Sequence, residues 1–127
     1  MEHHKLSRAE LNALADRLIA LYQSIEQNLA MARENAATVT LDQSSVGRLS
    51  RMDAMQQQAM ASVQRERLLV QQRRLTAAIQ RKDAGTLGTC CQCELTIPIE
   101  RLMSDPATPF CTDCQEEIDE RRREASL

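Results

Sequence analysis

Four cysteines carry the clearest chemistry in this sequence of 127 residues. They form two C-x2-C pairs separated by 17 residues, Cys90 with Cys93 and Cys111 with Cys114. Two residues between thiols let one tight turn direct both sulfur atoms to one ion, and two such turns complete the tetrahedral set that zinc prefers. Because four thiolates leave no position for water, the spacing predicts one structural Zn²⁺ rather than a catalytic one.

The alternative for these cysteines is a pair of disulfides. The sequence has no apolar run long enough for a membrane span and no signal peptide, so we expect a soluble, cytoplasmic protein in which thiols stay reduced. Cysteines as close as those within each pair do not bridge without strain. The fifth cysteine, Cys91, has no partner at the C-x2-C spacing, and we interpret it as a bystander, with a redox-accessible thiol as the alternative.

The remaining composition favours helices. The chain has no Trp, one Phe and one Tyr, and its apolar content is mostly Ala, Leu and Met, which are helix formers. Ser7 followed by Glu10 predicts a capping box at the start of a first helix. Apolar residues then recur at alternating spacings of three and four, as in a coiled coil. They are Leu11, Leu14, Leu18, Leu21, Ile25 and Leu29.

A second helix is predicted from about Ser45 to Asp83, with Asp42, Ser44 and Ser45 as candidate N-caps. Its expected seam comprises Leu49, Met52, Gln56, Ala59, Val63 and Val70, and a further stripe comprises Leu68, Leu75 and Ile79. A short connection forces the two helices to be antiparallel.

We therefore predict a mainly α fold with two parts. Residues 1–84 form a long antiparallel helical hairpin (coiled coil) with its tip near 38–47. Residues 85–127 form a small four-cysteine zinc finger and a short terminal helix.

Charge is distributed unevenly along the chain. Residues 44–89 hold eight basic and three acidic side chains, whereas residues 90–127 hold four basic and nine acidic ones. The basic series is interpreted as a solvated face, with a docking surface for an acidic partner as the alternative. It consists of Arg65, Arg67, Arg73, Arg74, Arg81 and Lys82. The cysteine spacing also occurs in GATA-type DNA-binding fingers, but an acidic finger repels a duplex, so no sequence-specific DNA binding is expected.

Several motifs around the cysteines resemble the C4-type zinc finger of the DksA/TraR family. The matching features are Gly85-Thr86-x-Gly88-x-Cys90-x-x-Cys93, then Ile97-Pro98-x-x-Arg101-Leu102, Pro106, and Cys111-x-x-Cys114-Gln115. The sequence departs from the family at Leu87, where an aromatic residue is usual, and at Glu94, where a glycine often follows the second cysteine.

The resemblance implies a bacterial transcription regulator that binds RNA polymerase directly through its secondary channel, often together with guanosine tetraphosphate. In that family an acidic hairpin tip approaches the polymerase active site. The connector here holds one carboxylate, Asp42, in place of two. The candidate partner-binding residues of the tip are Asp42, Ser44, Ser45, Arg48 and Asp53.

A second function class stays open. A coiled-coil interaction adaptor, or a dimer in which the zinc finger only caps the helices, fits the same pattern without any action on the polymerase active site. An enzyme is not expected, because the sequence offers no nucleophile–base pair and no open metal site.

Overall fold

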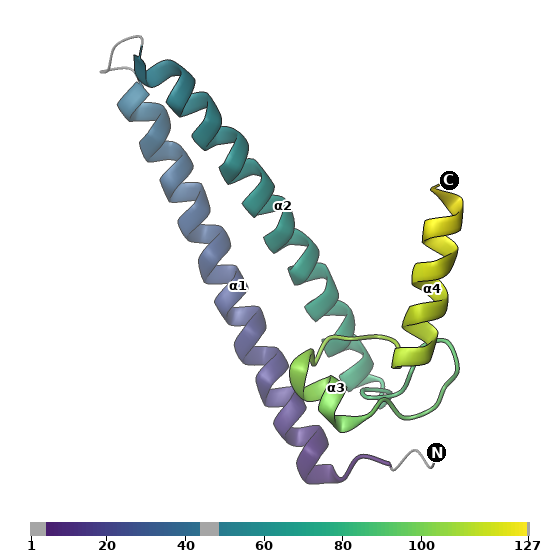
Figure 1. Cartoon of the computed structure of the whole chain (residues 1–127). Helices are drawn as coiled ribbons and strands as arrows, with labels where there is room; N and C mark the ends of the chain where they lie inside the picture. Colours follow the sequence, from purple (N-terminus) through teal and green to yellow (C-terminus); the bar gives the residue numbers. More distant parts are fainter. Residues whose placement is uncertain (1–4, 44–48, 127) are drawn as a thin grey trace. The chain divides into compact units, whose positions relative to one another are not determined.

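The computed structural model describes the backbone of residues 5–43 and 49–126, and the side chains of residues 5–34 and 51–126. Over this part of the chain it has the helices α1 (Arg8–Gln43), α2 (Leu49–Asp83), α3 (Ile99–Ser104) and α4 (Thr112–Ala125), shown in Figure 1. The same residues contain no β-strand, only an isolated antiparallel bridge between Thr89 and Thr96. The mainly α fold is therefore confirmed. None of the helices in the described ranges combines the length and apolar character that a membrane span requires.

The chain divides into two compact units. Unit 1 comprises Met1–Ala20 and Arg74–Leu127, and unit 2 comprises Leu21–Arg73. Unit 1 thus contains the start of α1, the end of α2 and all of α3 and α4, whereas unit 2 contains the rest of α1 and α2.

A reciprocal pair of side-chain hydrogen bonds begins α1. The Ser7 backbone N–H donates to Glu10 Oε1 at 2.9 Å, and the Glu10 backbone N–H donates to Ser7 Oγ at 3.1 Å. Both bonds satisfy backbone donors that a helix start leaves without intrahelical acceptors. The predicted capping box is confirmed.

The end of α1 differs from the expectation. The helix continues through the β-branched residues 38–40 to Gln43, so the backbone of Asp42 belongs to the last turn of α1 instead of capping α2, which begins at Leu49. Each β-branched residue costs a helix only a few tenths of a kcal/mol, which is too little to end it. The side chain of Asp42 and the residues Ser44, Ser45 and Arg48 lie outside the described part.

The apolar core lies mainly in unit 1. Leu14 and Leu18 of α1 are buried, as the leucine repeat predicted, and they share unit 1 with the buried Leu75, Ile97 and Leu102. These side chains come from both long helices, from α3 and from the segment before it. The start of α1 and the end of α2 thereby form one core with the segment that carries the cysteines.

A Schellman motif ends α2. Gly85 has a φ of +79°, its N–H donates to the Lys82 carbonyl at 3.1 Å, and the Thr86 N–H donates to the Arg81 carbonyl at 2.8 Å. Glycine occupies this left-handed position at no steric cost, so the chain turns directly out of α2 toward the first cysteine pair.

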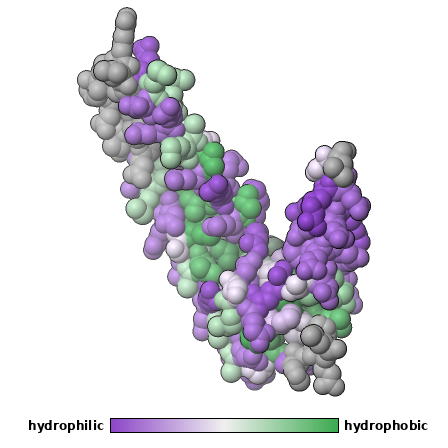
Figure 2. All heavy atoms as spheres, viewed as in Figure 1, coloured by the Kyte–Doolittle hydropathy of each residue, from purple (hydrophilic) through white to green (hydrophobic). Residues whose placement is uncertain are grey.

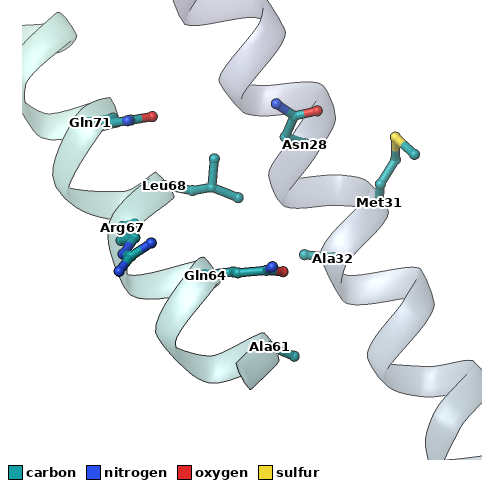
Figure 3. Close-up of a pocket in the computed structure, with 8 residues that line it drawn as sticks. All are labelled: Asn28, Met31, Ala32, Ala61, Gln64, Arg67, Leu68 and Gln71. Atoms are coloured by element: carbon teal, nitrogen blue, oxygen red, sulfur yellow. The ribbon is translucent and has the colours of Figure 1, made fainter. Parts of the chain in front are cut away.

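In unit 2, α1 and α2 run antiparallel, and the contact between them is partly polar. A hollow of ≈ 440 Å³ lies between the helices. Figure 3 shows Gln64 and Gln71 of α2 extending toward Ala32 and Asn28 of α1. Among the side chains described in unit 2, only Ile25 and Ala54 are buried.

The predicted seam of α2 is therefore wrong. Met52, Val63 and Val70 are 73%, 54% and 44% exposed, whereas Ala54 is buried and Leu68 faces the hollow. Two stripes with helical spacing run along α2. The one that packs on α1 in unit 2 contains Ala54, Ala61 and Leu68, and Leu68 belongs to the predicted further stripe, in which Leu75 is also buried. The hydrophobic pattern assigns the contact along most of α2 to Met52, Val63 and Val70, and it finds the stripe that makes the contact only from Leu68 onward.

Candidate metal centre

The four cysteine thiols of the two pairs gather at one point in unit 1. The sulfur atoms of Cys90, Cys93, Cys111 and Cys114 all lie within 4.8 Å of one another. The distance from Cys93 Sγ to Cys111 Sγ is 3.8 Å. A tetrahedral site with Zn–S bonds of about 2.3 Å has sulfur–sulfur edges of about 3.8 Å. This donor set fits one zinc ion.

The first cysteine pair lies in a tight loop closed by backbone hydrogen bonds. The Cys90 N–H donates to the Leu95 carbonyl at 2.8 Å, and the Glu94 N–H donates to the Cys90 carbonyl at 3.0 Å. Glu94 takes a φ of +64°, in the left-handed region that glycine favours. The loop thus directs both thiols to the four-sulfur cluster, at the cost of a strained residue directly after Cys93.

The second cysteine pair begins α4. Cys111 is the N-cap residue, and Cys114 is buried in the first turn. Phe110 precedes the pair, and its carbonyl accepts hydrogen bonds from Arg101 Nε at 2.9 Å and from Thr108 Oγ1 at 3.3 Å. The N-terminal end of a helix carries a partial positive charge, which favours thiolates over thiols.

Two further hydrogen bonds join the cysteine loops to each other. The Cys91 N–H donates to the Pro109 carbonyl at 2.8 Å, and Gln92 Nε2 donates to Glu117 Oε2 of α4 at 2.9 Å. The Cys91 thiol is exposed, and its sulfur does not belong to the four-sulfur cluster.

The thiols differ in acidity. Burial raises the pKa of Cys90, but hydrogen bonds from the backbone of Cys93, Cys111 and Gln92 outweigh it and lower that pKa to about 6. Backbone hydrogen bonding at Leu95 lowers the pKa of Cys93, yet burial and the thiols of Cys90 and Cys111 raise it above its ordinary value. Burial, followed by hydrogen bonds with the other three thiols, raises the pKa of Cys114. Cys90 is thus the most readily ionised of these three thiols.

Three arginines of the long helices bind α3 and the loop after it, all within unit 1. Arg17 of α1 donates to the Met103 carbonyl. Arg74 of α2 pairs with Asp105, and Arg81 Nη2 donates to the Ala107 carbonyl at 3.1 Å. Arg74 and Arg81, which were expected on a solvated or docking face, thus make contacts within the chain, although the Arg74 side chain stays 44% exposed. No local pattern marks these contacts, because the acceptors are mostly backbone carbonyls far away in the sequence.

Of the expected tip residues, Asp53 alone has a described side chain. It is exposed on α2 in unit 2, whereas the four cysteines belong to unit 1. The structure therefore brings together the metal-ligating candidates and leaves the tip candidates as a separate prediction.

Comparison with known proteins agrees with this geometry. Residues 85–120 match the family model described as "Prokaryotic dksA/traR C4-type zinc finger". The fold is similar to that of the transcription factor DksA2 from Pseudomonas aeruginosa, with a TM-score of 0.80 and 17% sequence identity over 92% of this chain and 88% of that one. No protein of curated function matches the chain in sequence. Residues 85–120 thus match the DksA/TraR C4-type zinc finger, and the chain as a whole has a fold similar to that of DksA2.

Proposed function

We propose that this protein is a bacterial transcription regulator that binds RNA polymerase directly through its secondary channel. One observation carries the proposal: a DksA/TraR zinc finger at residues 85–120 occurs within a fold like that of a transcription factor over 92% of the chain. In the proposal the helical pair of unit 2 is the part that enters the channel, and guanosine tetraphosphate acts jointly with the polymerase.

The zinc ion has a structural role in this proposal. Cys90, Cys93, Cys111 and Cys114 are its ligands and form a closed set that leaves no site for a substrate. The ion holds the first cysteine loop against the start of α4, and thereby maintains the segment that Arg74 and Arg81 bind.

Asp42 is the tip carboxylate proposed to act near the polymerase active site. Its backbone lies in the last turn of α1, where a negative charge opposes the helix dipole. Replacing Asp42 by Asn removes this charge at almost constant size. If the Asp42 carboxylate acts in transcription, the Asp42→Asn variant is expected to lose its effect on transcription without any loss of helix stability.

The test uses the zinc-loaded chain and purified bacterial RNA polymerase. We expect saturable binding that a second protein occupying the secondary channel abolishes, and an altered transcript yield with and without guanosine tetraphosphate. Asp42→Asn should bind the polymerase and lack the effect on transcription, while Cys91→Ser should behave like the unaltered chain. Absence of binding, or binding that is unaffected by a blocked channel, would contradict the proposal.

The second candidate is an interaction adaptor or dimer in which the zinc finger caps the helices. The exposed apolar side chains of α2, among them Met52 and Val63, favour it. Wild-type transcription by every tip variant, together with loss of self-association on changing α2, would select this candidate.

A further inference from the structure

An apolar stripe on α2 has no partner within unit 2. We define the α2 stripe as six positions spaced alternately four and three residues apart, namely Met52, Gln56, Ala59, Val63, Glu66 and Val70. Met52 is 73% exposed and Val63 is 54% exposed, large values for side chains of this kind. Figure 2 shows hydrophobic residues at the surface of the long helices, in contrast to the mostly hydrophilic face of α4.

The α2 stripe lies on a different side of the helix from the contact with α1. Ala54 is buried, and Ala61 and Leu68 line the hollow between α1 and α2. These three residues are spaced seven apart, and they mark the side of α2 that faces α1. At 100° of rotation per residue, Met52 and Val70 lie on the far side of α2 from them. The spacing of the stripe is that of a coiled-coil seam, which is stable only against another helix.

We propose that the α2 stripe is the contact face of an antiparallel homodimer of this chain. In an antiparallel coiled coil, residues equidistant from the two-fold axis face each other. With the axis at the level of residue 61, each stripe position meets another stripe position of the second copy. A two-fold interface must be self-complementary in this way, with one patch serving both copies.

The resulting layers match in chemistry. Met52 faces Val70 of the second copy, and Ala59 faces Val63, which gives apolar layers on both sides of the axis. Gln56 faces Glu66, so that an amide donor meets a carboxylate acceptor.

A parallel pair would set equal residues at the same level. Glu66 would then face Glu66 of the second copy, and two like charges in contact are unfavourable. The sequence of the stripe therefore selects the antiparallel arrangement.

Charges beside the stripe also complement each other. Asp53 and Arg67 each follow a stripe position by one residue, on the same edge of the stripe. The antiparallel arrangement brings Asp53 of one copy next to Arg67 of the other, twice by symmetry. Neither side chain forms an ion pair with another residue in the described part of the chain. The dimer thus supplies each charge with a partner. It rests on the second candidate function, for which it names the contact face and the arrangement, and its test needs no polymerase.

The test exchanges these charges in the zinc-loaded full chain and follows self-association by sedimentation velocity over a range of concentrations. Asp53→Arg sets arginines against each other and Arg67→Asp sets aspartates against each other, so each variant should dimerise about tenfold more weakly or worse. An equal mixture of the two variants restores both opposite-charge contacts and should dimerise like the unaltered chain. The double variant Asp53→Arg/Arg67→Asp should do the same.

Two controls separate this interface from general effects of charge. Arg65→Asp makes the same charge change away from the stripe and should leave the dimer intact, whereas Val63→Glu should abolish it while the helical circular dichroism signal is retained. A monomer at every concentration would overturn the proposal. A dimer that survives Val63→Glu, or single variants that the mixture does not restore, would overturn it as well.

Discussion

Arg74 of α2 and Asp105 at the C-terminal end of α3 form an ion pair in which Nη2 lies 2.6 Å from Oδ2. The Asp105 carboxylate also accepts a hydrogen bond from the Ala107 N–H at 3.3 Å. One side chain thus binds a long helix with one oxygen and shapes the loop after α3 with the other. The two roles can be separated by substitution.

Asp105→Asn should destabilise the protein by only about 0.3–1 kcal/mol, because the pair is more than two-fifths exposed and is screened by solvent, and the amide oxygen still accepts from Ala107. Asp105→Ala removes both interactions and should cost about 1–2 kcal/mol. Chemical denaturation of the zinc-loaded variants checks this order. Equal losses for Asn and Ala would show that the loop hydrogen bond contributes nothing.

Gly88 takes a φ of +84°, and a Cβ on it would collide with the side chain of Leu6. Gly85 has a similar φ of +79° but open space around it. Gly85→Ala should therefore cost about 1 kcal/mol from the backbone alone, while Gly88→Ala should cost about 2–3 kcal/mol in all. The control is the double variant Leu6→Ala/Gly88→Ala, in which the steric part of the loss should disappear. Equal losses for Gly85→Ala and Gly88→Ala would contradict the close contact.

Glu94 is the non-glycine residue with positive φ among the described residues. Replacing it by Gly should stabilise the zinc-loaded protein by about 0.5–1 kcal/mol, since glycine adopts this conformation without strain. Glu94→Ala keeps a Cβ in the same conformation and should bring no gain. A thermal denaturation series that ranks Ala with Gly would point to the charge of Glu94 instead of its backbone.

The protein should contain one zinc ion per chain, measured by metal analysis. Cys93→Ser and Cys114→Ser should lose the metal and unfold the region around the finger, because metal binding contributes folding free energy directly. The helical pair of unit 2 should be affected less. Cys91→Ser is the matched control and should keep the full zinc content. Metal loss in that variant, or cysteines oxidised in pairs in the unaltered protein, would show that the ligand set is wrong.

Zinc binding should release protons, and its apparent affinity should fall as the pH is lowered from about 8 to about 6. Above its pKa of about 6, Cys90 already provides a thiolate. Cys93 and Cys114 have raised pKa values, so they hold protons at neutral pH that the metal must displace. Calorimetric titrations in buffers of different ionisation enthalpy measure the number of protons. Binding without proton release would contradict the raised pKa values.

The sequence predicts features whose cause is local. The capping box needs only Ser7 and Glu10, and the four-thiol cluster follows from two short C-x2-C loops. The mainly α fold follows from helix propensity and from the leucines of α1, whose stripe has no competitor on that helix.

Features that depend on tertiary contacts were harder to predict. Helix α2 carries two stripes of similar periodicity, and hydrophobicity alone favours Met52, Val63 and Val70 over Ala54, so that only Leu68 and Leu75 of the other stripe were predicted to pack. Arg74 and Arg81 belong to a basic series whose members look alike in the sequence, so their binding to Asp105 and to the Ala107 carbonyl has no sequence signature. The strained conformation of Glu94 also has no sequence signature. The sequence shows only that Glu94 stands where the DksA/TraR family often has glycine.

Two of the three arginines that bind α3 and its loop do so through main-chain oxygens, those of Met103 and Ala107. A carbonyl is supplied by every amino acid, so these contacts make no demand on the identity of the residue that accepts them. Met103 is half exposed and can therefore be replaced by another residue without loss of the hydrogen bond. Arg17, by contrast, cannot be exchanged for a shorter side chain. These two contacts therefore depend on the identity of the donors Arg17 and Arg81 alone, whereas the third also requires the carboxylate of Asp105.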